Sequence, residues 1–248
     1  MASAKTVRHP KGHVHPDPEA GPSACGFVQA VVDSSVGAKL SVAFTGLALV
    51  GFVIGHLIGN LKMFQGPDSI NAYAYFLKHS LGVLIWIARI GLLGLFLLHL
   101  SLALRLSFRA RAARPVKYQY SRSVQAKAAS RFMMQTGIVI LAFVLFHLAH
   151  FTFGLVQNID YKDARGYHDV YRMVVNGFTN PVISVFYIVA QVVLFLHLRH
   201  GIPSTIQTLG IKSARWSRPI DLAGLAIAAV VLVGNVGIVI AVWAGVVH

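Results

Sequence analysis

The sequence predicts an all-α integral membrane protein built from five transmembrane helices. Of the 248 residues, 56% are hydrophobic and only 12% are charged, whereas an ordinary soluble domain has about 25% charged residues. The apolar residues gather in five stretches, each with about the 20 residues that a helix needs to cross a bilayer. Most of them lack the polar stripe of an amphipathic soluble helix. The stretches are residues 40–61, 82–104, 132–157, 181–198 and 220–247.

Polar segments separate these stretches and define the domain organisation. Residues 1–39 form an N-terminal arm rich in Pro, Gly and His, and no apolar core follows its first charges, as a cleavable signal would require. We expect one membrane domain over residues 40–248. The arm histidines His9, His13 and His15 could bind a metal, although a tail that contacts a partner is the favoured interpretation.

The positive charge of the chain is concentrated in two loops. The chain has 22 Lys and Arg against 8 acidic residues, a formal net charge of +14. The loop over residues 105–131 carries eight basic residues and no acid, and the loop over 199–221 carries four against Asp221. The positive-inside rule places both loops and the N-terminus in the cytoplasm, with His248 outside the cytoplasmic (inner) membrane. Because topology accounts for most of the basic residues, we expect no nucleic-acid partner.

Several classes of site are excluded by composition. The single cysteine, Cys25, cannot form an internal disulfide, a thiolate zinc cage or a cysteine-held iron–sulfur cluster. No C-x-x-C-H motif for covalent haem occurs. The scarcity of acids leaves almost no material for catalysis by paired carboxylates.

Histidines are the ionisable residues that recur within the apolar stretches. An ionisable side chain in the membrane is costly and is by default a functional candidate. Six histidines lie in or at the edge of the spans: His56, His99, His147, His150, His197 and His200.

Four of these histidines fall into two pairs by depth. The first and third stretches run outward, and His56 and His147 lie about 16 residues from their cytoplasmic ends, or ~24 Å. The second and fourth stretches run inward, and His99 and His197 lie about six residues from theirs, or ~9 Å. Two levels with two imidazoles each are typical of two stacked bis-histidine b haems enclosed by the first four helices.

An internal repeat supports this pairing. Thr45-Gly46 precedes His56 at the same spacing at which Thr136-Gly137 precedes His147. We expect both glycines at the level of the inner haem, where small residues let a macrocycle approach the backbone.

Three further residues near the haem levels have open roles. Arg89 lies ten residues before His99, at the level of the outer haem, and a haem propionate is its favoured partner over a backbone carbonyl. His150 and His200 each follow a candidate ligand by three residues. Either could replace its neighbour as the ligand, or bond a propionate or a quinone.

Over residues 34–213, the chain resembles the cytochrome b membrane subunit of succinate:quinone oxidoreductases (succinate dehydrogenase or fumarate reductase), of the single-chain five-helix di-haem type. This resemblance implies the ligands His56, His99, His147 and His197, and it favours His197 over His200 because Gly201 follows four residues later. Some fumarate reductases of this kind have a membrane glutamate just before that ligand, whereas here the preceding residue is Leu196. The matching segments are residues 45–60, 113–115, 136–152 and 197–210, with Arg89 and His99.

The resemblance also implies partners and a role. We expect a flavoprotein subunit and an iron–sulfur subunit on the cytoplasmic face, membrane lipids around the spans, and electron transfer through two haems b to a lipid quinone, with menaquinone as the expected species. Quinone reduction needs protonatable or polar groups near one haem. The candidates are Gln65, Asn71, His79 and His168 at the outer mouth, and Ser35, Lys39 and Gln207 at the inner side.

Two alternatives remain at the level of sequence. The chain could be the di-haem anchor of another quinone-linked oxidoreductase, such as a nitrate reductase or a hydrogenase. It could also be a haem-free transporter with a histidine proton relay, although the spans lack acids and broken-helix signals.

Overall fold

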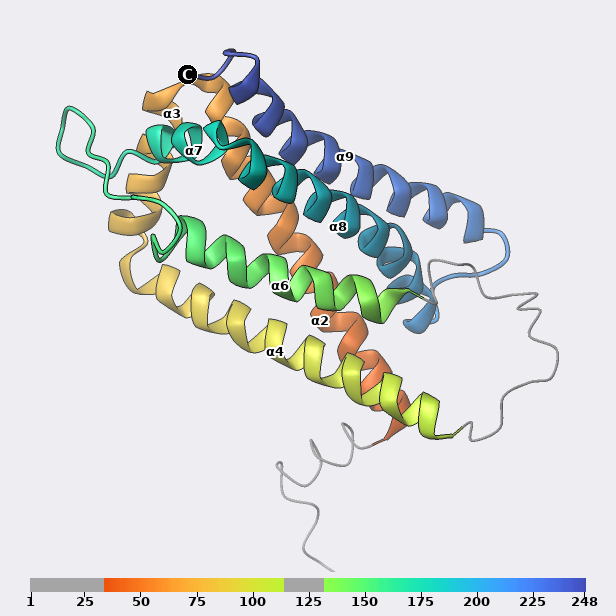
Figure 1. Cartoon of the computed structure of the whole chain (residues 1–248). Helices are drawn as coiled ribbons and strands as arrows, with labels where there is room; N and C mark the ends of the chain where they lie inside the picture. Colours follow the sequence, from red (N-terminus) through yellow and green to blue (C-terminus); the bar gives the residue numbers. More distant parts are fainter. Residues whose placement is uncertain (1–33, 114–131) are drawn as a thin grey trace, which may run out of the picture.

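The computed structural model describes residues 34–113 and 132–248, and within these ranges the chain forms helices and no strand (Figure 1). Five of the described helices are long and apolar enough to cross a membrane. This confirms the all-α class with five candidate spans and supports a multi-pass membrane protein. The five are α2 (Ser35–Asn60), α4 (Gly82–Ala112), α6 (Met133–Phe151), α8 (Pro181–Thr208) and α9 (Ser217–Trp243).

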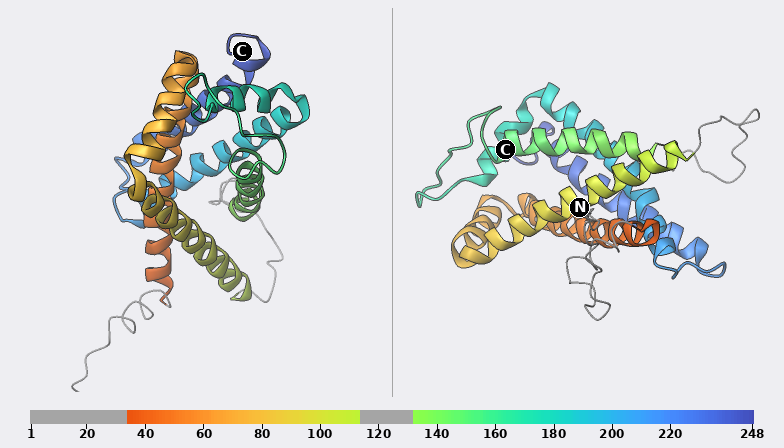
Figure 2. Two further views of the ribbon diagram at one scale, coloured as in Figure 1. Left: turned by 90° about the vertical axis from the view of Figure 1, so that its left-hand side faces the viewer. Right: turned by 90° about the horizontal axis from the view of Figure 1, so that it is seen from below.

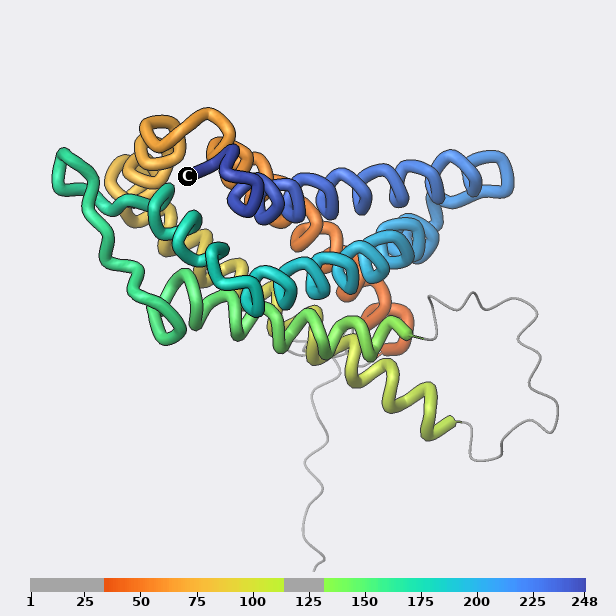
Figure 3. Tube along the Cα trace, turned by 45° about the horizontal axis from the view of Figure 1, so that its top comes forward, coloured from red at the N-terminus to blue at the C-terminus, as the bar shows by residue number. Residues whose placement is uncertain are grey.

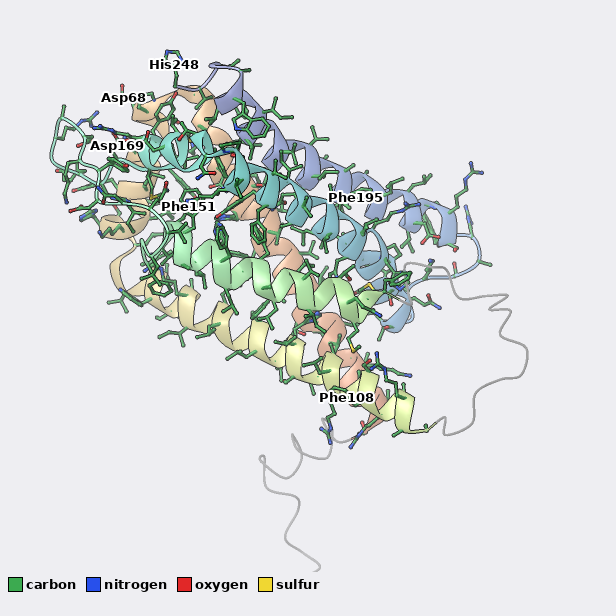
Figure 4. All side chains as sticks on the ribbon, in the orientation of Figure 1. Asp68, Phe108, Phe151, Asp169, Phe195 and His248 are labelled. Carbon is green, nitrogen blue, oxygen red and sulfur yellow. The ribbon has the colours of Figure 1, made fainter. Side chains whose placement is uncertain are left out.

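The long helices run side by side in alternating directions (Figures 1 and 2). Two short helices, α3 (Pro67–Tyr75) and α7 (Val170–Thr179), lie at the end of the bundle that also holds the C-terminus. Figure 4 labels Asp68, Asp169 and His248 at this α3–α7 end and Phe108 toward the other. The opposite end, where α2 begins and α4 and α8 end, we call the basic end. Its described basic residues are Lys39, Arg105, Arg109, Arg111, Arg199, Lys212, Arg215 and Arg218.

Several helix bounds differ from the sequence prediction. Helix α4 continues past residue 104 to Ala112, into the segment predicted as a basic loop, and α9 spans Ser217–Trp243 rather than 220–247. Helix α2 begins at Ser35 because the Ser34 hydroxyl caps it by accepting from the Gly37 N–H at 2.9 Å, so the last residues of the expected arm are helical. Helix α6 ends at Phe151 rather than at residue 157, and the chain then turns at Gly154 with φ 64°. Helix α8 continues ten residues past 198, through Pro203.

Helices α3 and α7 lie in segments predicted only as loops, and side-chain capping explains how they hold together. The Asp169 carboxylate caps α7 by accepting from the Arg172 N–H at 3.0 Å. The same carboxylate oxygen accepts from the Asn71 amide at 2.9 Å, and Asn71 in turn accepts from the Tyr171 N–H at 3.0 Å. These bonds join α3 to the start of α7 and close one end of the bundle.

Packing is uneven around the bundle. Helices α8 and α9 lie side by side (Figure 3), and α9 approaches α2 closely, since a Cβ on Gly234 would stand 2.7 Å from a Leu57 methyl carbon. In contrast, α4 buries only Leu102 and α6 buries only His150 among their described residues. Helices α4 and α6 are therefore lightly packed, and they carry two of the four candidate ligands, His99 and His147.

Candidate functional site: two histidine pairs

His56 on α2 and His147 on α6 form the first histidine pair. Their ring centroids are 5.8 Å apart and their planes are nearly perpendicular, at 89°. One turn before each histidine a phenylalanine packs against it, with ring centroids 5.5 Å apart for Phe52 and 5.8 Å apart for Phe143. The structure therefore brings together the two histidines that helix direction placed at one depth, and it repeats the same local packing on both helices.

The spacing of the first pair fits a shared metal. A metal about 2 Å from one nitrogen of each of two imidazoles on its opposite sides holds the ring centroids about 6 Å apart. The observed 5.8 Å is close to that value. Neutral imidazole is also a common axial ligand of haem iron, so the residues present fit the haem that the sequence predicts.

His99 on α4 and His197 on α8 form the second histidine pair, and they are near enough to interact electrostatically. Each imidazole bonds through Nδ1 to a threonine of a neighbouring helix. The distance to the hydroxyl is 3.2 Å from His99 to Thr45 and 3.0 Å from His197 to Thr136. The repeated threonines therefore contact the second histidine pair: Thr45 of α2 bonds to the histidine of α4, and Thr136 of α6 bonds to the histidine of α8.

These threonines fix which ring nitrogen can bind a metal. The Thr45 hydroxyl donates to the Ser41 carbonyl at 2.7 Å, and the Thr136 hydroxyl donates to that of Met133 at 3.0 Å. Because each hydroxyl proton is already used, its oxygen accepts from the histidine Nδ1–H. Nε2 is then the deprotonated nitrogen, and an Nδ1–H held by an outer partner is the usual state of a histidine that binds metal.

The glycines beside these threonines adjoin the same rings. A Cβ on Gly46 would lie 3.1 Å from Cε1 of His99, and a Cβ on Gly137 would lie 3.8 Å from Cε1 of His197. The sequence prediction that both glycines reach the inner level agrees with these distances. The two sites differ in tightness, because only the approach at Gly46 is closer than ordinary van der Waals contact.

The structure separates His147 from His150. His150 is 0% exposed, enclosed by protein atoms, whereas His147 is half-buried. A planar macrocycle has no open face at His150, so the geometry favours His147 as the ligand. His200 is half-buried at the far end of α8 and interacts electrostatically with His197.

Arg89 contacts an aromatic ring of its own helix. Its guanidinium lies over the Trp86 ring, 5.1 Å from the centroid, on an exposed face of α4. A cation over an aromatic face is a favourable contact. The propionate partner of Arg89 stays a prediction.

The quinone candidates at the α3–α7 end are engaged in local contacts. Asn71 joins α3 to α7, and the Gln65 amide oxygen accepts from Ser69 at 2.7 Å. His79 stacks on Tyr75 with ring centroids 4.1 Å apart. Burial and then the charge of Lys78 lower the pKa of His168, so it is neutral at neutral pH. Three of the four quinone candidates at this end, Asn71, Gln65 and His79, are therefore in contact with other side chains of the protein.

At the basic end, the structure brings two inner candidates together. A cavity of about 420 Å³ lies between α2 and α8, and Lys39 and Gln207 both line it, whereas Ser35 does not. Four of its six lining residues carry polar side chains, which could form hydrogen bonds to a bound small molecule. The full lining is Val36, Lys39, Leu40, Ser204, Gln207 and Thr208.

Two sequence predictions lie outside the described residues. These are the arm histidines His9, His13 and His15, and the segment from Arg114 through the basic part of the loop that ends at Arg131. Tyr187, in contrast, was missed by sequence reasoning although it bonds to both His147 and His150, because nothing local marks a tyrosine on α8 as a neighbour of α6.

Comparisons with protein-family models, curated proteins and solved structures find no match.

Proposed function

We propose that this chain is the membrane anchor and electron-transfer subunit of a succinate:quinone oxidoreductase, and that it holds two b haems. The first pair would hold one haem and the second pair the other. The supporting observation is that four helices present two histidine pairs, with the ring centroids of the first pair 5.8 Å apart. When bound, the haems supply one-electron exchange between an iron–sulfur subunit and a membrane quinone.

The protein residues orient the ligands and exclude water. Thr45 and Thr136 hold the second pair in the tautomer that leaves Nε2 free. Phe52 and Phe143 pack apolar rings against the first pair. An apolar shell lowers the local dielectric and controls solvent access, which together set the potential of a redox centre.

The basic end is the proposed docking face for the soluble partners. Positive charge there favours the cytoplasmic side and would attract acidic surfaces of the flavoprotein and iron–sulfur subunits, as well as anionic lipid headgroups. The second pair lies toward this end. His99 precedes the first basic residue of the end of α4, Arg105, by six residues, and His197 lies two residues before Arg199.

The cavity at the basic end is the proposed quinone site. Ser204 and Gln207 can donate hydrogen bonds to a quinone carbonyl, and Lys39 adds a positive charge. The turn of α8 that lines the cavity adjoins the second pair. Both the Thr205 hydroxyl, at 3.9 Å, and the His99 ring, at 3.1 Å, lie next to the position of a Cβ on Gly46.

A spectrum of the purified protein tests the proposal. We expect a dithionite-reduced minus oxidised spectrum with b-type haem bands and a ratio of two haems per chain. Purification under mild conditions should retain a flavoprotein and an iron–sulfur protein, identifiable by mass spectrometry. The absence of b-type bands in protein isolated from its native membrane would contradict the proposal and favour a haem-free transporter.

Substitutions in the cavity test the quinone site. The double variant Lys39→Met with Gln207→Leu should raise the KM for quinone on the order of tenfold, because it removes two polar contacts that help to hold the headgroup. It should leave the haem spectrum unchanged. Gln65→Leu, at the α3–α7 end, is the matched control. A raised KM in the control, with none in the double variant, would move the site to the other end.

A further inference from the structure

Tyr187 bridges two imidazoles of α6. Its hydroxyl oxygen lies 3.3 Å from Nδ1 of His147 and 3.0 Å from Nδ1 of His150. Both Tyr187 and His150 are buried, at 5% and 0% exposed. The three polar groups form a chain that starts at the first histidine pair and leads away from His56.

This series of hydrogen bonds has one consistent arrangement of protons when His147 binds a metal, and in that respect the inference rests on the proposed function. If His147 binds a metal through Nε2, its Nδ1 carries the proton and donates to the Tyr187 oxygen. The Tyr187 hydroxyl then donates to His150, which accepts at Nδ1 and keeps its own proton on Nε2. Each bond has one donor and one acceptor, so the binding of metal at His147 specifies the tautomer of His150.

The burial of His150 is not explained by its own hydrogen bonds. Within the described residues, its Nε2 is buried without a hydrogen-bond partner, with the Gln157 side chain as its polar neighbour. An unpaired buried polar atom costs free energy, and an apolar residue at this position would avoid that cost. The Nδ1 atom of His150 bonds to Tyr187 at 3.0 Å, so one side of its imidazole acts on Tyr187, and the Gln157 side chain interacts with it separately.

The two histidine pairs differ in this respect. On the second pair, the hydrogen bonds from Nδ1 end at backbone carbonyls. That of His197 passes through Thr136 to Met133, and those of His99 pass through Thr45 to Ser41 and directly to Val42, at 3.2 Å. On the first pair, the bond from His147 passes through a tyrosine and ends at another side chain. The group that ends the series on the first pair is the His150 side chain, so a substitution can alter it, whereas a backbone carbonyl cannot be substituted.

We propose that Tyr187 and His150 are positioning residues for His147, and that they tune the redox centre held by the first pair. By accepting the Nδ1–H, Tyr187 fixes the ring orientation and increases the electron density that the imidazole gives to the metal. His150 holds the Tyr187 hydroxyl in the direction that this bond needs. Increased electron donation stabilises the oxidised metal and lowers the midpoint potential of this centre alone.

Tyr187→Phe tests the proposal because it removes the hydroxyl and keeps the ring. We expect two haems per chain, with the midpoint potential of one raised; a tenfold change in the relative affinity for the oxidised and reduced metal corresponds to about 59 mV for one electron. A redox titration followed by optical and electron paramagnetic resonance spectra measures both centres separately. The matched control is Thr136→Val, which should shift the other centre, held by His197, and leave the first unchanged.

If the Tyr187→Phe protein does not accumulate in the membrane, two variants of His150 still test the proposal. Asparagine keeps an acceptor near the position of Nδ1, so His150→Asn should retain the wild-type potential. Leucine removes the acceptor, so His150→Leu should raise the potential of the first centre. Equal potentials in His150→Leu and wild type, or an unchanged first centre in Tyr187→Phe, would overturn the inference. Failure of the proposed function would look different, since wild-type protein would then lack b-type bands.

Discussion

Alanine variants of the four candidate ligand histidines are expected to sort into two pairs by the proposed haem that each loses. His99→Ala and His197→Ala should lose the same haem, because the two rings adjoin Gly46 and Gly137 and are near enough to interact electrostatically. Each histidine of a pair would supply one of the two protein ligands of the proposed haem, and alanine cannot replace it. We therefore expect a fall from two haems per chain to one in each variant.

His56→Ala and His147→Ala should lose the other haem. Their rings are 5.8 Å apart, so either variant opens the same centre. Low-temperature difference spectra resolve the two haem bands and identify which one remains. His79→Ala, at the α3–α7 end, is the control and should keep both. Loss of one and the same haem from His56→Ala and His99→Ala would contradict the pairing.

Alanine at the two repeated glycines should have unequal effects. In Gly46→Ala the new methyl stands 3.1 Å from Cε1 of His99, so the ring must move by a few tenths of an ångström. That movement strains the bond from His99 to Thr45, which is already 3.2 Å long. Loss of a hydrogen bond that orients a metal ligand typically costs 10–100-fold in affinity, and we expect the second centre of Gly46→Ala to lose haem accordingly.

Gly137→Ala is the matched variant, because its methyl would stand 3.8 Å from the His197 ring, at ordinary contact distance. If only the histidine rings limit space, Gly137→Ala keeps both haems while Gly46→Ala loses part of one. If a macrocycle also lies against both glycines, both variants lose haem from the second centre. Haem content during serial dilution in detergent measures the difference. Full haem retention in Gly46→Ala would show that the approach of the ring to α2 is not needed.

The helical class and the depth of the histidines follow from the sequence alone. Hydropathy and length determine which segments can span a bilayer, and helix rise converts residue number into depth. Both are local quantities, so His56 and His147 could be matched without knowledge of packing. The repeated Thr-Gly spacing likewise placed Gly46 and Gly137 near the second pair, where the structure finds them.

Local signals were weaker at helix ends and in short helices. The end of α6 at Phe151 was missed because the apolar run continues past it, and the turn depends on Gly154. Helices α3 and α7 were missed because they are held together by the bond from Asn71 within α3 to Asp169, the cap of α7, which is 98 residues away in the chain. Bonds over such separations leave no periodic pattern in the sequence.

Only the tertiary structure decided which side chains meet across helices. Rotation of each helix about its axis determines that Thr45 faces His99 and that Tyr187 lies between His147 and His150. In a membrane, hydrophobicity does not specify that rotation, since lipid and protein interiors are about equally apolar. Close packing and buried hydrogen bonds specify it instead, and they are properties of the assembled bundle. The sequence thus determined the depth of the histidines, and the packing of the helices determined their hydrogen-bond partners.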